Sequence, residues 1–139
     1  MHVGVFHMTT GGFRSGLDMA GYTARKDIDE AVAMVRKGID EGRYVLCAQV
    51  QAADMDEAYE LTQNLTEEGW AAGPAVEFAA QHRDGKNRQR SSMVGDMFLF
   101  DGDAYIIGGI GFIKLPGIAR IISDFGFDGR TGTAFDDSL

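Results

Sequence analysis

The sequence predicts one compact α+β domain: a mixed or antiparallel sheet of roughly four to six strands with two main helices on one face. Three observations lead to this fold class. One segment repeats its apolar residues with a helical period, several short apolar segments have the length of strands, and an Asp-Gly pair separates two apolar runs as in a hairpin. We expect residues 1–124 to form the domain and residues 125–139 to be a loosely held tail rich in Gly and Asp.

The first half of the chain predicts two strands and one long helix. His2–His7 has the character of a strand, and Thr9–Gly16 follows it as a glycine-rich loop. An amphipathic helix is predicted over Asp27–Glu41, and Tyr44–Val50 is apolar enough for a central strand. The apolar residues of this helix recur on one face: Ile28, Ala31, Val32, Val35 and Ile39.

The second half begins with another predicted helix, which starts at Asp54 and ends at Gly69. A turn at Trp70–Pro74 and a strand at Ala75–Ala80 follow. The expected inward face of this helix shares the same 3.6-residue period: Met55, Ala58, Tyr59, Thr62 and Leu65.

A hairpin is predicted where Asp101-Gly102-Asp103 separates the apolar runs Met97–Phe100 and Ala104–Ile113. A short helix at Gly117–Ser123 completes the domain. Three glycines inside the second run mark a bulge, or a place where a core residue such as Trp70 or a flat ligand packs on the backbone: Gly108, Gly109 and Gly111. We expect one core that includes Ile28, Val32, Val35, Val45, Cys47, Tyr59, Leu65, Phe98 and Ile106.

Composition limits the classes of partner and the compartment. The net charge of −8 argues against general nucleic-acid binding. The single cysteine, Cys47, excludes an internal disulfide and fits a reducing compartment. The longest apolar run is too short to span a membrane, and the first residues do not have the pattern of a signal peptide. We therefore expect a cytoplasmic protein without a membrane partner.

A basic segment, Gln81–Arg90, is the first candidate site. Its four cations, less Asp84, give a net charge of +3, so the remaining residues sum to −8 − 3 = −11. The segment is either a solvated surface loop or an anion site, since guanidinium groups pair with phosphate and carboxylate oxygens. The candidate ligand-binding residues here are Arg83, Lys86, Arg88 and Arg90, with Ser91 and Ser92 as hydroxyl donors and Gly95 for backbone approach.

A secondary candidate is the glycine-rich loop, through Thr9, Thr10 and Arg14. Glycine-rich loops after a strand can hold phosphate by backbone N–H groups. This loop lacks the spacing of a P-loop or a dinucleotide-binding motif, so the alternative is a flexible connection.

No catalytic arrangement is recognisable. The histidines and Cys47 lack metal-ligand spacing, and no nucleophile, base and orienting group can be assembled. We predict a protein that is not an enzyme and has no metal and no cofactor. Carboxylates of the second helix region form an acidic face that is either solvated or meets a basic protein partner: Asp54, Asp56, Glu57, Glu60, Glu67 and Glu68.

Two stretches, Asp56–Asn64 (DEAYELTQN) and Arg90–Asp96 (RSSMVGD), resemble motifs of small accessory proteins from actinobacteria, their plasmids and their phages. Trp70 and Gly111-Phe112 fit further positions of that pattern, whose second half is similar to the YodL-like domain of mobile-element proteins. The resemblance covers about Tyr44 to Phe112. Met93 departs from it, because it replaces a serine.

The resemblance implies a phage or mobile-element context and no particular activity. Combined with the basic segment, it suggests a non-enzymatic accessory protein that binds a small anionic ligand. One form would be an anti-defence protein that sequesters a host nucleotide signal. The alternative is a protein-interaction module that inhibits a host protein through its acidic helix face, and an enzyme is the third hypothesis. The sequence leaves the oligomeric state open. At Asp96 a purely structural role is also open, since its carboxylate can pin a tight turn.

Overall fold

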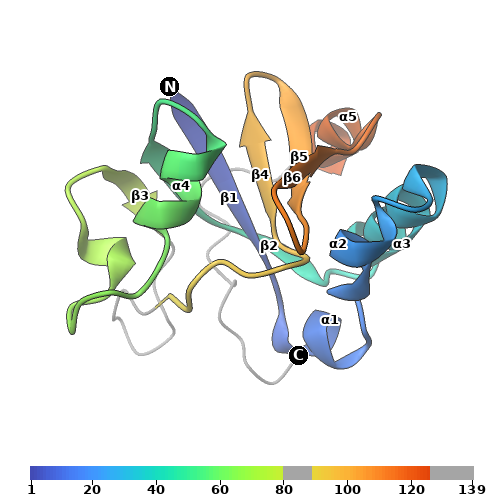
Figure 1. Cartoon of the computed structure of the whole chain (residues 1–139), viewed down its shortest axis with the longest axis horizontal. Coiled ribbons are helices and arrows are strands. Elements are labelled where there is room, and N and C mark those ends of the chain that lie inside the picture. Colours follow the sequence, from blue (N-terminus) through green and yellow to red (C-terminus); the bar gives the residue numbers. More distant parts are fainter. Residues whose placement is uncertain (80–88, 126–139) are drawn as a thin grey trace.

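A computed structural model describes residues 1–79 and 89–125, and in these ranges the chain folds as an α+β domain around a single antiparallel sheet (Figure 1). The strand order is β3-β2-β1-β4-β5-β6, and every neighbouring pair is antiparallel. This confirms the predicted fold class. The strands are β1 (His2–Met8), β2 (Tyr44–Gln51), β3 (Val76–Ala79), β4 (Met97–Phe100), β5 (Asp103–Ile107) and β6 (Phe112–Lys114).

Helices lie between β1 and β2, between β2 and β3, and after β6, and they cover both faces of the sheet. They are α1 (Thr10–Arg14), α2 (Met19–Thr23), α3 (Ile28–Asp40), α4 (Met55–Leu61), the 3₁₀ turn η1 (Trp70–Ala72) and α5 (Ile118–Phe125). None of these helices is both long and apolar enough to cross a membrane. The predicted tail lies outside the described residues except for Phe125, which ends α5.

The long helix α3 follows the prediction closely. Asp27 caps its first turn by accepting a hydrogen bond from the backbone N–H of Glu30 (3.1 Å). Ala31, Val35 and Ile39 are fully buried against the sheet, as their 3.6-residue spacing predicts.

The core consists of two clusters on opposite faces of the sheet, where the sequence analysis predicted one. The two longest helices, α3 and α5, share one face with α2, and Val35 and Ile106 belong to that cluster. Helix α4 and η1 cover the other face, where Cys47 and Phe98 are buried. The helix predicted from Asp54 therefore lies opposite α3, because alternate residues of the central strands are apolar on both sides.

Helix α4 is also shorter than predicted, since it ends at Leu61 rather than near Gly69. The Thr62 hydroxyl donates back to the carbonyl oxygens of Ala58 (2.9 Å) and Tyr59 (3.1 Å), which closes the last turn. Leu65 consequently lies in the following loop with 80% of its surface exposed, so its assignment to the core is wrong.

Two glycine-rich segments also differ from the prediction. Thr9–Gly16 is not a flexible loop: it contains α1, whose first turn is capped by Thr9 through the N–H of Gly12 (3.0 Å). The predicted strand Ala104–Ile113 is a second hairpin, in which Gly108–Gly111 forms the turn between β5 and β6. The side chain that packs on this turn is Tyr22, not Trp70.

Candidate functional site

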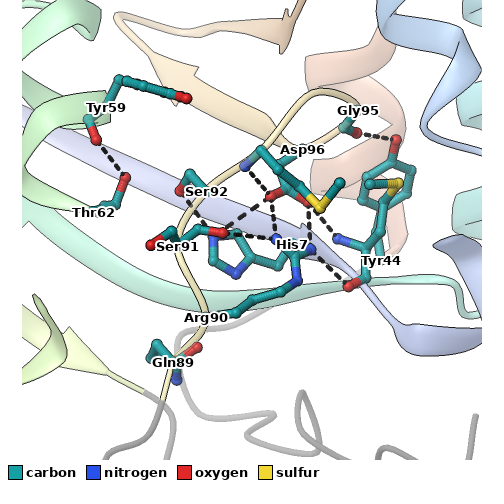
Figure 2. A network of polar contacts seen from close by, with 12 residues as sticks. His7, Tyr44, Tyr59, Thr62, Gln89, Arg90, Ser91, Ser92, Gly95 and Asp96 are labelled. Atoms are coloured by element: carbon teal, nitrogen blue, oxygen red, sulfur yellow. Dashed lines mark hydrogen bonds and ion pairs between the residues drawn. The ribbon is translucent and has the colours of Figure 1, made fainter. Parts of the chain in front are cut away.

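A buried carboxylate, Asp96, is the centre of a network of polar contacts (Figure 2). Its Oδ1 accepts the backbone N–H of Met8 and its Oδ2 accepts that of Met93, both at 2.8 Å. Arg90 pairs with it bidentately, Nη1 to Oδ2 at 2.6 Å and Nη2 to Oδ1 at 2.7 Å. We call Asp96 together with His7, Tyr44, Arg90 and Ser92 the Asp96 network.

Arg90 donates all four N–H groups of its terminal nitrogens to acceptors within the protein. Besides Asp96, Nη2 donates to the carbonyl oxygen of Met8 (3.0 Å) and Nη1 to that of Ser91 (3.0 Å). Burial lowers its pKa, but the hydrogen bonds and charge of Asp96 outweigh burial, so the pKa of Arg90 is raised. The interpretation of Arg90 as a ligand-binding cation is therefore corrected, because its guanidinium group already holds an internal anion.

His7 is a member of the network that sequence reasoning missed. Its Nε2 lies 2.9 Å from Ser92 Oγ and 3.8 Å from Asp96 Oδ2, and its ring meets Trp70 edge-on at 6.0 Å. Burial lowers the pKa of His7 to about 4; Arg90 lowers it further, and Asp96 opposes both. His7 is thus neutral near pH 7. The available signal was its position inside an otherwise apolar strand.

The combination of Ser92, His7 and Asp96 does not have the geometry of a catalytic triad. In a triad the serine and the carboxylate bind opposite nitrogens of the imidazole ring. Here both lie nearest Nε2, and Nδ1 has no hydrogen-bond partner among the described residues. Ser92 is also buried, so its hydroxyl does not face solvent.

A buried thiol, Cys47, lies close enough to the network to feel the charge of Asp96. Cys47 is fully buried, and burial raises the pKa of its thiol, so it remains protonated. Within residues 1–79 and 89–125, no group of three or more His, Cys, Asp or Glu side chains is placed to hold a metal ion.

The two motif stretches singled out in the sequence meet at this network, which fixes the segment Gln89–Ser92. Hydrogen bonds with the end of α4 hold this segment. Ser92 N–H donates to Thr62 O (3.0 Å), and Gln63 Nε2 donates to Ser92 O (3.1 Å). Asn64 donates twice, from its backbone N–H to Ser91 Oγ (2.8 Å) and from Nδ2 to Gln89 O (2.7 Å). Trp70 adds a bond from Nε1 to the carbonyl oxygen of Arg90 (2.8 Å).

Gly95 is also engaged internally. Its N–H donates to Ile107 O (3.0 Å) and its carbonyl oxygen accepts the Tyr44 hydroxyl (2.7 Å). Its φ of +96° and the position of Asp18, whose Cα would lie 2.5 Å from an added Cβ, both require glycine. Its predicted role in exposing an N–H to a ligand is therefore wrong.

The other predicted site residues are not brought together by the described structure. Arg83, Lys86 and Arg88 lie outside the described residues. Ser91 and Ser92 use their hydroxyls within the protein. In the secondary loop, Thr9 caps α1 with its side chain, whereas Thr10 is half-buried and Arg14 is exposed.

A separate open groove of about 410 Å³ lies at the other end of β1. Its lining includes Gly4, Phe6, Leu46, Leu99 and Asp101. Among the predicted site residues that the structure describes, none lines this groove.

Comparison with known protein families, curated proteins and solved structures finds no match for this chain.

Proposed function

We propose that the protein is a non-catalytic binding protein whose basic segment, Gln81–Arg90, contacts a small anionic ligand through Arg83, Lys86 and Arg88. The observation that carries the proposal is the fixation of Gln89–Ser92 by the Asp96 network, Asn64 and Trp70. This arrangement uses Arg90 internally. By sequence, the rest of the segment carries Arg83, Lys86, Arg88 and Asp84, a net charge of 3 − 1 = +2 on a chain of net −8.

The residues that flank the undescribed part of the basic segment, Ala79 and Gln89, are both held by the fold, which favours binding of a ligand there. Ala79 pairs with Ala48 in the sheet, and Gln89 is buried beside Asn64. A ligand that contacts a segment with fixed ends has less chain entropy to offset than one that orders a free terminus. Guanidinium groups at Arg83 and Arg88 suit phosphate oxygens in particular, because they can donate two parallel hydrogen bonds.

The finer parts of the proposal rest on the resemblance of the two motif stretches. On that ground we propose a cytoplasmic accessory protein of a phage or mobile element. A nucleotide is then the first ligand class to test, with sequestration of a host nucleotide signal, a form of anti-defence, as the biological role.

A thermal-shift panel of nucleotides and cyclic nucleotides tests the proposal. A ligand at 100 times its Kd adds about 2.7 kcal/mol, which is roughly 10 °C for a domain of this length. The triple variant Arg83→Gln, Lys86→Gln, Arg88→Gln should lose the shift. The matched control Arg36→Gln, Lys37→Gln, which neutralises exposed cations on α3, should keep it. Equal shifts in both variants would exclude the basic segment as the site.

A second candidate function is favoured by the surface around Leu65. This side chain is 80% exposed, and carboxylates before and after it in the sequence are exposed as well. An apolar side chain among acidic groups suits a basic protein partner, which the protein would inhibit by occupying it. If the protein acts this way, Glu60→Lys with Glu67→Lys should abolish its action on a host protein, and the triple variant of the basic segment should retain it.

A further inference from the structure

Three large apolar side chains are exposed close together on the surface formed by α2 and the β5–β6 turn. Met19 and Tyr22, one helical turn apart on α2, are 51% and 49% exposed, and Ile110 at the tip of the turn is 75% exposed. We call these three residues the α2 patch. Exposed apolar residues that gather at one place mark interaction surfaces in soluble proteins.

The α2 patch is a fixed surface, because the β5–β6 turn is held against α2 (Figure 1). Arg25 Nη2 donates to the carbonyl oxygen of Ile110 at 2.7 Å. Glycines allow the close approach: an added Cβ would lie 3.0 Å from the Tyr22 ring at Gly109 and 2.4 Å from Ile107 O at Gly21. Tyr22 thus packs directly on the turn whose tip carries Ile110.

Opposite charges lie at equal sequence separations on either side of Tyr22. Asp18 precedes it by four residues and Lys26 follows it by four. Hydrogen bonds from Ala24 N–H to Ala20 O and from Asp27 N–H to Thr23 O continue the helical course past the end of α2. Positions four apart share a helix face, so the order along the patch is negative, apolar, positive. Within the described part of the chain, neither Asp18 nor Lys26 forms an ion pair.

We propose that the α2 patch binds a second copy of this chain in a two-fold symmetric dimer, with the two α2 helices antiparallel. A two-fold axis near Tyr22 places each Asp18 opposite Lys26 of the partner subunit and brings the apolar side chains together at the centre. A uniformly acidic or basic partner would match only one end of this charge order. The antiparallel copy matches both ends.

The small area of the patch implies a weak dimer that forms as concentration rises. Sedimentation velocity over about a hundred-fold range of concentration should show the wild type shifting from the monomer mass towards twice that mass. Ile110→Ser should remove the shift; at a side chain this exposed, the substitution leaves the fold intact. Leu65→Ser, which removes an apolar group of similar exposure elsewhere, should leave the shift unchanged.

Charge reversal tests the antiparallel geometry. Asp18→Lys and Lys26→Asp should each raise the dimer dissociation constant about tenfold or more, because each repulsive contact occurs twice in a two-fold dimer. The double variant Asp18→Lys, Lys26→Asp should restore the wild-type dissociation constant. A wild type that stays monomeric throughout overturns the proposal, as does a double variant that remains monomeric while its thermal melt matches the wild type.

Discussion

Replacing Arg90 with Gln should destabilise the fold strongly, because it leaves the buried Asp96 carboxylate without its counter-charge. Asp96 is 0% exposed and would keep only its two backbone donors, Met8 and Met93. Removing one partner of a buried ion pair costs about 3–5 kcal/mol. The Arg90 side chain is 37% exposed, and solvent screening favours the lower end, so we expect about 3 kcal/mol.

Urea denaturation measures this loss, followed by circular dichroism and by the fluorescence of the single tryptophan, Trp70, which bonds to the Arg90 backbone. The matched control Arg36→Gln changes an exposed arginine on α3 and should stay within about 0.5 kcal/mol of the wild type. The reasoning is refuted if Arg90→Gln and Arg36→Gln unfold at the same urea concentration.

A double-mutant cycle separates the ion pair from the other bonds of Arg90. Asp96→Asn alone should also be costly, since an amide offers one acceptor oxygen where Met8, Met93 and Arg90 need two. With both substitutions present, no charge is left unpaired, and the loss should fall short of the sum of the single losses by about 2 kcal/mol. Additive losses would show that the two side chains do not act as a pair.

Three further predictions follow from the same structure. Because burial lowers the pKa of His7 from 6.5 to about 4, the unfolded chain binds more protons between these values, so stability should fall by about 3 kcal/mol as pH drops through this range. Unfolding titrations of His7→Gln should show a flatter profile, and an equally steep one would contradict the assignment. Gly95→Ala should lower the free energy of unfolding by more than about 2 kcal/mol, because φ is +96° and an added Cβ would lie 2.5 Å from another backbone segment. The control Gly42→Ala, with φ +69° and open space around it, should lower it by about 1 kcal/mol. Equal losses in the two variants would refute the predicted clash at Gly95. Val35→Ala in the core should lower stability by about 1–3 kcal/mol. Thermal melts should show Leu65→Ala within about 0.5 kcal/mol of the wild type. A larger loss for Leu65→Ala than for Val35→Ala would mean that the helix orientations are wrong.

Local patterns predicted those elements whose structure is decided locally. The period of Ala31, Val35 and Ile39 identifies the buried face of α3, and Asp101-Gly102 identifies the β4–β5 hairpin. In both cases side-chain spacing or turn chemistry determines the conformation without help from distant parts of the chain.

The face of the sheet covered by α4 and the end of that helix could not be predicted in this way, because contacts distant in sequence decide them. Leu65 continues the apolar period of α4, but Asn64 is held by Gln89 and Ser91, some 25 and 27 positions away. That tertiary anchor ends the helical course before Leu65 can reach the core. The second hairpin was missed for a different reason: its Gly108–Gly111 turn lies within a continuous apolar run that has the composition of a strand.

For the candidate site, the sequence predicted a basic segment, Gln81–Arg90, but not the internal role of Arg90. A cluster of cations predicts an anion site whether the anion is a ligand or the protein's own carboxylate, and only the fold reveals that Asp96 fills this place for Arg90. His7 was missed because it is 85 positions from Ser92, so no spacing rule connects them.

Met93 stands where the motif that the chain resembles has a serine, and its backbone is what serves the fold. Position 93 contributes to the Asp96 network through its backbone N–H, which donates to Asp96 Oδ2 at 2.8 Å. Any residue other than proline supplies that donor, so methionine in place of serine leaves the network intact, and its side chain instead packs against the core on the α3 face. Arg90, Gly95 and Asp96 have no such freedom, since the network needs a guanidinium fork, a positive φ and a carboxylate at these positions. These three residues are therefore requirements of the fold, and the proposed contact with a ligand would have to come from other side chains.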